Sequence, residues 1–242
     1  MTMPRQVVVT GGGTGIGYAV AAKFAATGDH VTITGRREKV LAEAASSLGV
    51  QYVAFDASDP AAVTGALADL PDRVDVLVNN AGGNTDIGGA NATGDLAAMA
   101  DAWTANFRAN VLSAVLVTNA LIPRFPDNAR IVTIGSIAAP QGSGSYGAAK
   151  AAVESWTAGL SRDLGPRGIT ANVVAPGLIE GTEFFRGTLT DERRATLIAN
   201  TRNKRAGTVA DLAETVAFLA SPGAGHLTGQ VVHLNGGAHL GR

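Results

Sequence analysis

Short apolar runs alternate with longer alanine-rich stretches along the chain, and this alternation limits the possible folds more than any other feature. Runs such as VVVT and VDVLV are apolar at consecutive positions, which is typical of parallel strands covered on both faces. We expect strands over residues 5–10, 30–34, 50–55, 74–79, 129–135, 170–174 and 230–234. Helices are expected over residues 15–27, 37–48, 60–70, 96–123, 145–164 and 209–219. This order predicts an α/β fold, a Rossmann-type doubly wound parallel sheet of about seven strands with helices on both faces.

The segment from Gly177 to Gly207 interrupts this alternation and mixes charged residues with Phe184 and Phe185. Irregular segments of this length commonly form lids or binding loops. We find no internal repeat, linker or low-complexity tract elsewhere in the sequence. The chain is therefore expected to form one domain over residues 1–242, with a substrate lid over residues 177–207.

Composition excludes several classes of function. Apolar residues make up 46% of the 242 residues and charged residues 16%, which indicates a well-buried globular chain. The net charge of −1 gives no electrostatic basis for binding nucleic acid or a membrane surface. The chain has no Cys, and its His residues lack the spacing of metal ligands, so we expect no disulfide and no metal. The N-terminus lacks the apolar core of a signal peptide and no apolar run approaches a membrane span, so we expect a cytoplasmic protein.

A glycine-rich turn, TGGGTGIG from Thr10 to Gly17, follows the first predicted strand and opens the first predicted helix. Glycines at 11, 15 and 17 allow a tight turn and let backbone N–H groups approach a pyrophosphate. The spacing differs from the G-x-G-x-x-G pattern, and alone it also fits an ordinary turn. Its place between strand and helix favours a nucleotide site.

The second predicted strand ends at Gly35 without the carboxylate that NAD sites use to bind the adenosine ribose. Arg36 and Arg37 follow, and arginines at this place suit the 2′-phosphate of NADP. A solvated basic helix start is the alternative, although cations there oppose the helix dipole. We favour NADP(H) as the cofactor, with NAD(H) as the alternative.

Polar and small residues also follow the third and fourth predicted strands, at the edge of the sheet where ligands bind. Either segment alone also fits turn formation with Asn or Asp caps. The residues concerned are Asp56, Ala57, Asn80, Ala81 and Gly82.

A serine, a tyrosine and a lysine follow the fifth predicted strand, as Ser136, Tyr146 and Lys150. Tyr146 and Lys150 are four residues apart, so on a helix they share a face. A nearby ammonium stabilises a phenolate, so we expect Lys150 to lower the pKa of Tyr146. The pattern indicates proton exchange with an alcohol or ketone, and that chemistry requires a hydride partner.

Together these motifs resemble the short-chain dehydrogenase/reductase family, in the right order over nearly the whole chain. They are TGGGTGIG, NNAG, Asn110, Ser136, YGAAK and NVVAPG. The resemblance implies that Ser136 polarises the substrate carbonyl and that Tyr146 donates the proton. It also implies that Lys150 binds the nicotinamide ribose and that Asn110 holds a water that relays protons. The cofactor residues implied are Gly11, Thr14, Gly15, Ile16, Gly17, Arg36, Arg37, Asp56, Ala57, Asn80, Ala81, Gly82, Tyr146, Lys150, Pro176, Gly177, Ile179 and Thr182.

Asn110 lies in a long apolar helical stretch that also contains Asn106 and Asn119. Asn is a poor helix former, so its ordinary place in a helix is an exposed position, which we expect for Asn106 and Asn119. Asn110 differs because Trp103 precedes it by seven residues and an apolar run follows, as in this family. We expect its side chain to replace a broken backbone hydrogen bond at a helix kink.

Two positions depart from the family pattern. The interval from Ser136 to Tyr146 is shorter than usual, so Ser143 and Ser145 are alternatives to Ser136. Thr14 stands where many NADP-preferring members carry a basic residue, which leaves most of the phosphate recognition to Arg36.

We therefore expect an NADP(H)-dependent oxidoreductase that reduces a ketone or oxidises the matching secondary alcohol. A 3-oxoacyl substrate is one possibility, and a sugar, steroid or secondary-metabolite alcohol is the alternative. A non-catalytic dinucleotide-binding sensor is the alternative from another class. A homotetramer or homodimer is expected, because the C-terminal region of this family often contributes to a subunit interface.

Overall fold

A seven-stranded parallel sheet forms the centre of the molecule, in the order β3-β2-β1-β4-β5-β6-β9. The structure is a computed structural model that describes residues 4–87 and 95–241. The strand order reverses between β1 and β4, which places the binding crevice of a doubly wound sheet beyond these two strands. The predicted fold class is confirmed. The strands are β1 (Gln6–Thr10), β2 (His30–Gly35), β3 (Gln51–Ala54), β4 (Val76–Asn79), β5 (Arg130–Ile134), β6 (Thr170–Pro176) and β9 (Val231–Leu234).

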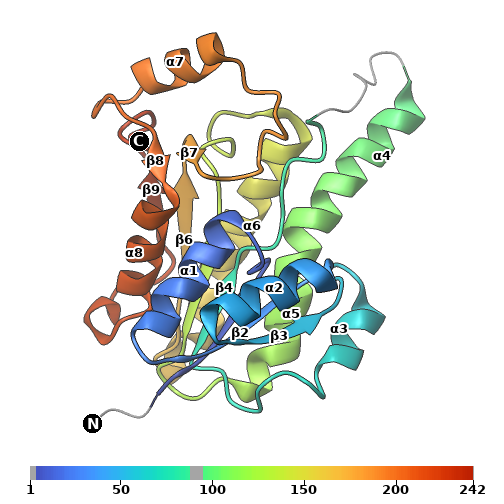
Figure 1. Ribbon diagram of the computed structural model, residues 1–242, viewed down its shortest axis with the longest axis vertical. Helices are drawn as coiled ribbons and strands as arrows, with labels where there is room; N and C mark the ends of the chain where they lie inside the picture. The colour runs from blue at the N-terminus through green and yellow to red at the C-terminus, as the bar shows by residue number, and fades with distance from the viewer. Residues whose placement is uncertain (1–3, 88–94, 242) are drawn as a thin grey trace.

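Helices cover both faces of this sheet (Figure 1). Helices α1, α2 and α8 pack on one face, while α3, α5 and α6 pack on the other. Val7 and Val9 of β1 belong to the first core and Val8 to the second, because successive side chains of a strand point to opposite faces. The main helices are α1 (Gly15–Ala26), α2 (Glu38–Leu48), α3 (Pro60–Ala66), α4 (Leu96–Phe107), α5 (Ser113–Leu121), α6 (Gly144–Leu164) and α8 (Val209–Leu219).

The single helix predicted over residues 96–123 is interrupted. A π-helical turn, Arg108–Leu112, separates α4 from α5, and a 3₁₀ turn, Ile122–Arg124, follows α5. Within the described ranges, the run Leu96–Arg124 is the one helix long and apolar enough to cross a membrane, so the expectation that no run approaches that length is wrong. Val117 and Leu121 lie in the core on the face of the sheet that α3, α5 and α6 cover, which accounts for the apolar character of α5.

The predicted lid, residues 177–207, contains a helix that the sequence pattern did not indicate. Helix α7 (Asp191–Ala199) starts at Thr190, whose hydroxyl accepts a hydrogen bond from Arg193 N. None of the residues of α7 is buried, so this helix has no apolar periodicity to detect. The short strands β7 (Ile179–Glu180) and β8 (Gly207–Thr208) pair at its base. Figure 1 shows α7 beyond the carboxyl end of β6, at the top of the view.

Candidate active site

The glycine-rich turn joins β1 to α1 at the carboxyl edge of the sheet. Gly11 has a φ of 66° and Gly15 a φ of 55°, which is the left-handed region that favours glycine. A Cβ on Gly17 would lie 2.2 Å from the carbonyl oxygen of Gly11, so the helix approaches the turn at a distance that only glycine allows. Thr14, the N-cap of α1, makes no side-chain hydrogen bond to the helix start. An uncapped helix N-terminus beside a glycine turn fits a pyrophosphate, and hence a dinucleotide.

Asn80 and Thr10 hold this turn against the end of β4. The amide of Asn80 donates to Thr10 O at 3.0 Å and to Gly11 O at 3.1 Å. The hydroxyl of Thr10 accepts from the backbone N–H groups of Asn80 and Ala81, both at 3.0 Å. Both amide hydrogens of Asn80 are therefore used inside the protein, so its amide sets the shape of the turn.

Two arginines follow β2, Arg36 and Arg37, and their environments differ. Arg36 is exposed, and its charge acts on Asp56 of the next strand end. Burial raises the pKa of Asp56, but hydrogen bonds from Ser58 and the nearby cationic charge outweigh burial and hold that pKa below its ordinary value. Arg37 instead lies 3.4 Å from the carboxylate of Glu183, a residue of the lid. Arg36 is thus the freer of the two cations for an anionic ligand.

Ser136, Tyr146 and Lys150 come together where β5 leads into α6. Tyr146 is 6% exposed and Lys150 is 5% exposed. The Nζ of Lys150 lies 5.8 Å from the centre of the Tyr146 ring and donates to Ile134 O at 2.8 Å. The side chain of Ser136 lies near enough to Tyr146 to act on the pKa of its phenol, and its hydroxyl accepts a hydrogen bond from Ala138 N at 3.1 Å. The structure therefore brings together the three residues that the sequence indicated.

The alternative serines do not share this position. Ser143 is exposed at the start of α6. Ser145 is buried, but its hydroxyl donates at 2.8 Å to Oδ2 of Asp86, a residue of the loop after β4. Ser136 is the serine whose side chain acts on the pKa of Tyr146, despite the short interval between them.

The expected lowering of the Tyr146 pKa is wrong for the protein without ligand. Burial raises the pKa of Tyr146 to about 12, and the nearby hydroxyl of Ser136 opposes this only in part. Burial likewise lowers the pKa of Lys150 to about 8, against the opposing charge of Glu154. Desolvation disfavours the charged form of each group, and here it outweighs the effect of Ser136 on Tyr146 and that of Glu154 on Lys150. At neutral pH the phenol is therefore protonated and the lysine is still mostly cationic.

Asn110 lies in the π-helical turn and is 2% exposed. Its amide donates to Asn106 O and to Gly83 O, each at 2.9 Å, and its Oδ1 accepts from Gly83 N at 3.0 Å. The first of these bonds satisfies a helix carbonyl, as expected at a kink. The other two attach the loop after β4 to the helix. The water-relay role of Asn110 stays a prediction.

Asn106 is the centre of a buried network that the sequence did not indicate. It is 0% exposed, so its expected place on the surface is wrong. Its amide donates to Asp86 Oδ1 and to Ser145 Oγ, both at 2.8 Å, and its Oδ1 accepts from Thr85 N at 3.1 Å. The sequence feature that indicates burial of Asn106 is its position four residues before Asn110, on the same helix face. The network fixes the residue that directly precedes Tyr146.

The first residues of the predicted lid lie beside the glycine-rich turn and Tyr146. A Cβ on Gly15 would lie 3.7 Å from the side chain of Thr182. The ring of Phe184 is 5.7 Å from the ring of Tyr146. At the base of the lid, Pro176 O accepts from Ile137 N at 2.9 Å, so β6 ends beside the serine loop. Phe184 is thus a site residue that sequence reasoning did not single out.

We expect Asn106→Leu to lower the free energy of unfolding by about 2–3 kcal/mol, because it leaves buried polar partners unsatisfied. Chemical denaturation monitored by circular dichroism measures this change. Asn119→Leu is the matched control: Asn119 is exposed and bonds only to Val115 O of its own helix, so we expect a change within about 0.5 kcal/mol. Equal losses in the two variants would contradict the structural role of the network.

The chain is similar to characterised proteins over nearly its whole length. The family described as enoyl-(acyl carrier protein) reductase matches residues 11–239. The 3-oxoacyl-[acyl-carrier-protein] reductase FabG of Escherichia coli (strain K12) is 35% identical over 247 residues, covering 98% of each chain. A short-chain dehydrogenase/reductase from Brucella melitensis, described as a glucose/ribitol dehydrogenase, has a TM-score of 0.85 at 31% identity, covering 98% of this chain and 97% of its own.

A short-chain dehydrogenase from Burkholderia cenocepacia J2315, solved in complex with NADP, has a TM-score of 0.82 at 33% identity and covers 97% of each chain. The chain belongs to the short-chain dehydrogenase/reductase family and is an NAD(P)-dependent oxidoreductase.

Proposed function

We propose that this enzyme reduces a ketone to a secondary alcohol with NADPH, and that Tyr146 supplies the proton. The observation that carries the proposal is the buried Tyr146, which lies beside Ser136 and has its ring centre 5.8 Å from the Nζ of Lys150. A 3-oxoacyl compound is the first candidate substrate, supported by 35% identity to the E. coli 3-oxoacyl reductase. A sugar alcohol is the second candidate, because the Brucella structure is described as a glucose/ribitol dehydrogenase.

The proposed chemistry follows from the two hydroxyl groups. A ketone oxygen placed between Ser136 and Tyr146 accepts a hydrogen bond from each, and these donors stabilise the charge that develops there. The nicotinamide ring supplies the hydride when the cofactor is bound. Tyr146 then gives its proton to the substrate oxygen, and the ammonium of Lys150 stabilises the phenolate that remains. The role of Asn110 in returning a proton from water rests on the family resemblance.

The pKa values favour the reductive direction at neutral pH. With a pKa of about 12, Tyr146 is almost entirely in its acid form, which is the form that reduction uses. Alcohol oxidation uses the phenolate, which is scarce at that pH. Lys150, with a pKa of about 8, loses its charge as the pH rises through that value, so reduction is best supported below about pH 8.

NADP(H) is the proposed cofactor, with NAD(H) as a weaker alternative. The glycine turn and the uncapped start of α1 fit the pyrophosphate. The exposed Arg36 at the end of β2 provides a cation for a 2′-phosphate, while Arg37 is paired with Glu183. The relative from Burkholderia was solved with NADP. Thr14 adds no charge, so Arg36 carries most of the proposed phosphate recognition.

We also propose that the enzyme works in the cytoplasm as a homodimer or homotetramer. Large apolar side chains on α4 support self-association, because exposed apolar patches commonly mark protein interfaces. The cytoplasmic location rests on the sequence alone. The exposed side chains concerned are Leu96, Met99, Trp103 and Phe107.

Tyr146→Phe tests the catalytic assignment. The variant keeps the ring and removes the acidic hydroxyl, so we expect ketone reduction to fall by at least about 100-fold. NADPH affinity should change by less than about threefold, because the ring still fills the same buried place. Rates are measured by NADPH oxidation with a panel of ketones, and affinity by NADPH fluorescence. Wild-type turnover in the variant would contradict the role of Tyr146. NADPH binding by the wild type without turnover of any ketone would favour the dinucleotide sensor.

Arg36→Ala tests the cofactor preference. We expect the wild type to favour NADPH over NADH in kcat/KM by at least about tenfold, and the variant to lose most of this preference. The loss should fall on NADPH, since NADH has no 2′-phosphate. Arg73→Ala is a suitable control, because Arg73 pairs with Asp75 at the opposite end of the sheet. Equal kcat/KM values for both cofactors in the wild type would overturn the assignment.

A further inference from the structure

Lys150 is a buried cation with few partners. It is 5% exposed, and its ammonium group, which has three N–H donors, donates to Ile134 O at 2.8 Å. Among the described residues, no carboxylate oxygen lies within 4.0 Å of its Nζ. Because a buried ammonium is costly to keep charged, its ionisation depends on charged groups at somewhat longer range.

Glu154 follows Lys150 by one turn of α6. Residues four apart share a helix face, and helical side chains lean toward the N-terminus, so the Glu154 carboxylate comes near the lysine. Glu154 is partly buried, and its Oε1 is shielded from solvent without a hydrogen-bond partner in the part of the chain that the structure describes. A carboxylate oxygen in such a place is unfavourable unless a cation is near it. The two side chains therefore compensate each other's charge.

The two groups act on each other's ionisation in opposite senses. Burial lowers the pKa of Lys150 to about 8, and the charge of Glu154 offsets part of this effect. Burial raises the pKa of Glu154, and the charge of Lys150 offsets part of that. Without the carboxylate only the effect of burial remains, so the pKa of Lys150 would fall further below its ordinary value.

Other charged residues near α6 do not take the place of Glu154. The elements packed against α6 are α4, the π-helical turn, β6, which has no charged residue, and the 3₁₀ turn Gly165–Arg167. The charged residues on these elements, on β5 and on the loop after β4 are Asp86, Asp101, Arg108, Arg130 and Arg167. All but Arg130 are exposed, and Arg130 donates to carbonyls at the start of β5, while Ile134 lies at its end. Among the described residues, Glu154 is the one charged group that clearly shifts the pKa of Lys150.

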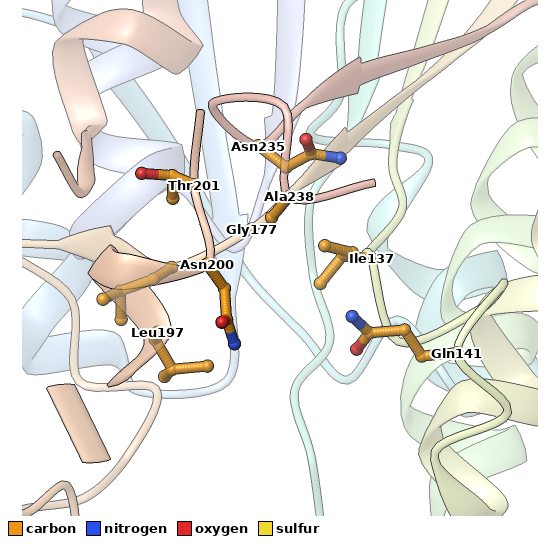
Figure 2. A pocket seen from close by; sticks show the side chains of 9 residues that line it. Ile137, Gln141, Gly177, Leu197, Asn200, Thr201, Asn235 and Ala238 are labelled. Carbon is orange, nitrogen blue, oxygen red and sulfur yellow. The ribbon is translucent and has the colours of Figure 1, made fainter. Parts of the chain in front are cut away.

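The cavity beside the serine loop adds no charge either. It has a volume of about 280 Å³ and lies between the loop after β5, the predicted lid and the turn after β9, and Figure 2 shows the side chains that line it. Its polar side chains are the amides of Gln141, Asn200 and Asn235 and the hydroxyl of Thr201, and none of the described lining residues is charged. Glu154 is therefore the counter-charge on which the ionisation of Lys150 depends.

We propose, on the basis of the ketone reduction proposed above, that Glu154 is a positioning residue that keeps Lys150 cationic. It acts through the lysine and does not exchange a proton with the substrate. With its charge retained, Lys150 stabilises the phenolate that remains when Tyr146 has given its proton to the substrate oxygen. The carboxylate thereby extends ketone reduction to higher pH.

Glu154→Gln tests this role through the pH profile of kcat/KM for ketone reduction at saturating NADPH. We expect the alkaline limb of the profile to move to lower pH by about 0.5–1 unit, because the lysine loses its charge earlier. At pH 6, where the lysine is charged in both enzymes, the rates should agree within about threefold. A merely structural defect would lower the rate at every pH and leave the limb in place.

Two further variants serve as controls. Glu154→Asp keeps the charge, so we expect it to restore at least about half of the shift. Asp163→Asn removes the same charge from the same helix, but Asp163 is exposed and pairs with Arg162, so the limb should move by less than about 0.2 unit. An equal shift in Asp163→Asn would overturn the proposal, since net charge alone would then account for the effect.

A titration of Lys150 itself gives a readout that does not require turnover. The chain has four lysines, so protein labelled with ¹³C at the lysine Cε gives few NMR signals, and Lys150→Gln identifies the one from Lys150. We expect a midpoint of about 8 in the wild type and a lower one in Glu154→Gln. Equal midpoints in the two proteins would overturn the proposal.

The outcomes separate this proposal from the proposed function. If the wild type reduces ketones but the alkaline limb stays in place in Glu154→Gln, the role of Glu154 is overturned and ketone reduction stands. If the wild type reduces no ketone on the panel, the proposed function fails. The midpoint of Lys150 alone then decides whether Glu154 keeps this lysine charged.

Discussion

The burial of Tyr146 beside Lys150 is the interaction on which the rest of the site depends. Burial keeps the phenol protonated, with a pKa of about 12, and at the same time lowers the pKa of the neighbouring lysine to about 8. In the proposed mechanism, this protonated phenol gives its proton to the substrate oxygen while the ammonium of Lys150 stabilises the phenolate that remains. The same burial gives the site a low dielectric, in which the donors of Ser136 and Tyr146 act more strongly than in water.

Polar networks around this pair keep it in place. Asn106 joins Asp86 to Ser145, next to Tyr146 in the chain, and Asn110 ties the loop after β4 to the π-helical turn. On the cofactor side, Asn80 and Thr10 hold the glycine turn against β4. Buried amides that are paired at both ends, as those of Asn106 and Asn110 are, specify one geometry, because each alternative arrangement leaves a donor or acceptor unsatisfied. The site therefore consists of strand ends held together by side-chain hydrogen bonds, with the predicted lid beside them.

Most of the fold could be predicted because both faces of the sheet are buried. Each core strand then reads as a continuous apolar run, and all seven predicted strands are present with small shifts at their ends. The positions of Ser136, Tyr146 and Lys150 followed from the strand end and from helical spacing. Helix α7 and the burial of Asn106 could not be predicted in this way. The first has no buried face, and the second is held by tertiary hydrogen bonds that leave no periodic pattern. The direction of the Tyr146 pKa shift could not be predicted either. It depends on how far α6 and residues such as Phe184 bury the phenol, and the sequence does not reveal this packing.

A titration of Tyr146 tests the central claim most directly. Protein labelled with ¹³C at the tyrosine Cζ reports ionisation of each phenol by NMR, and the Tyr146→Phe variant identifies the Tyr146 signal. We predict that in the free enzyme Tyr146 stays protonated past the ordinary tyrosine pKa of 10.0, toward a pKa of about 12. A midpoint below 10.0 would contradict the account, because the resting proton donor would then be a group activated by Lys150 and not one kept neutral by burial.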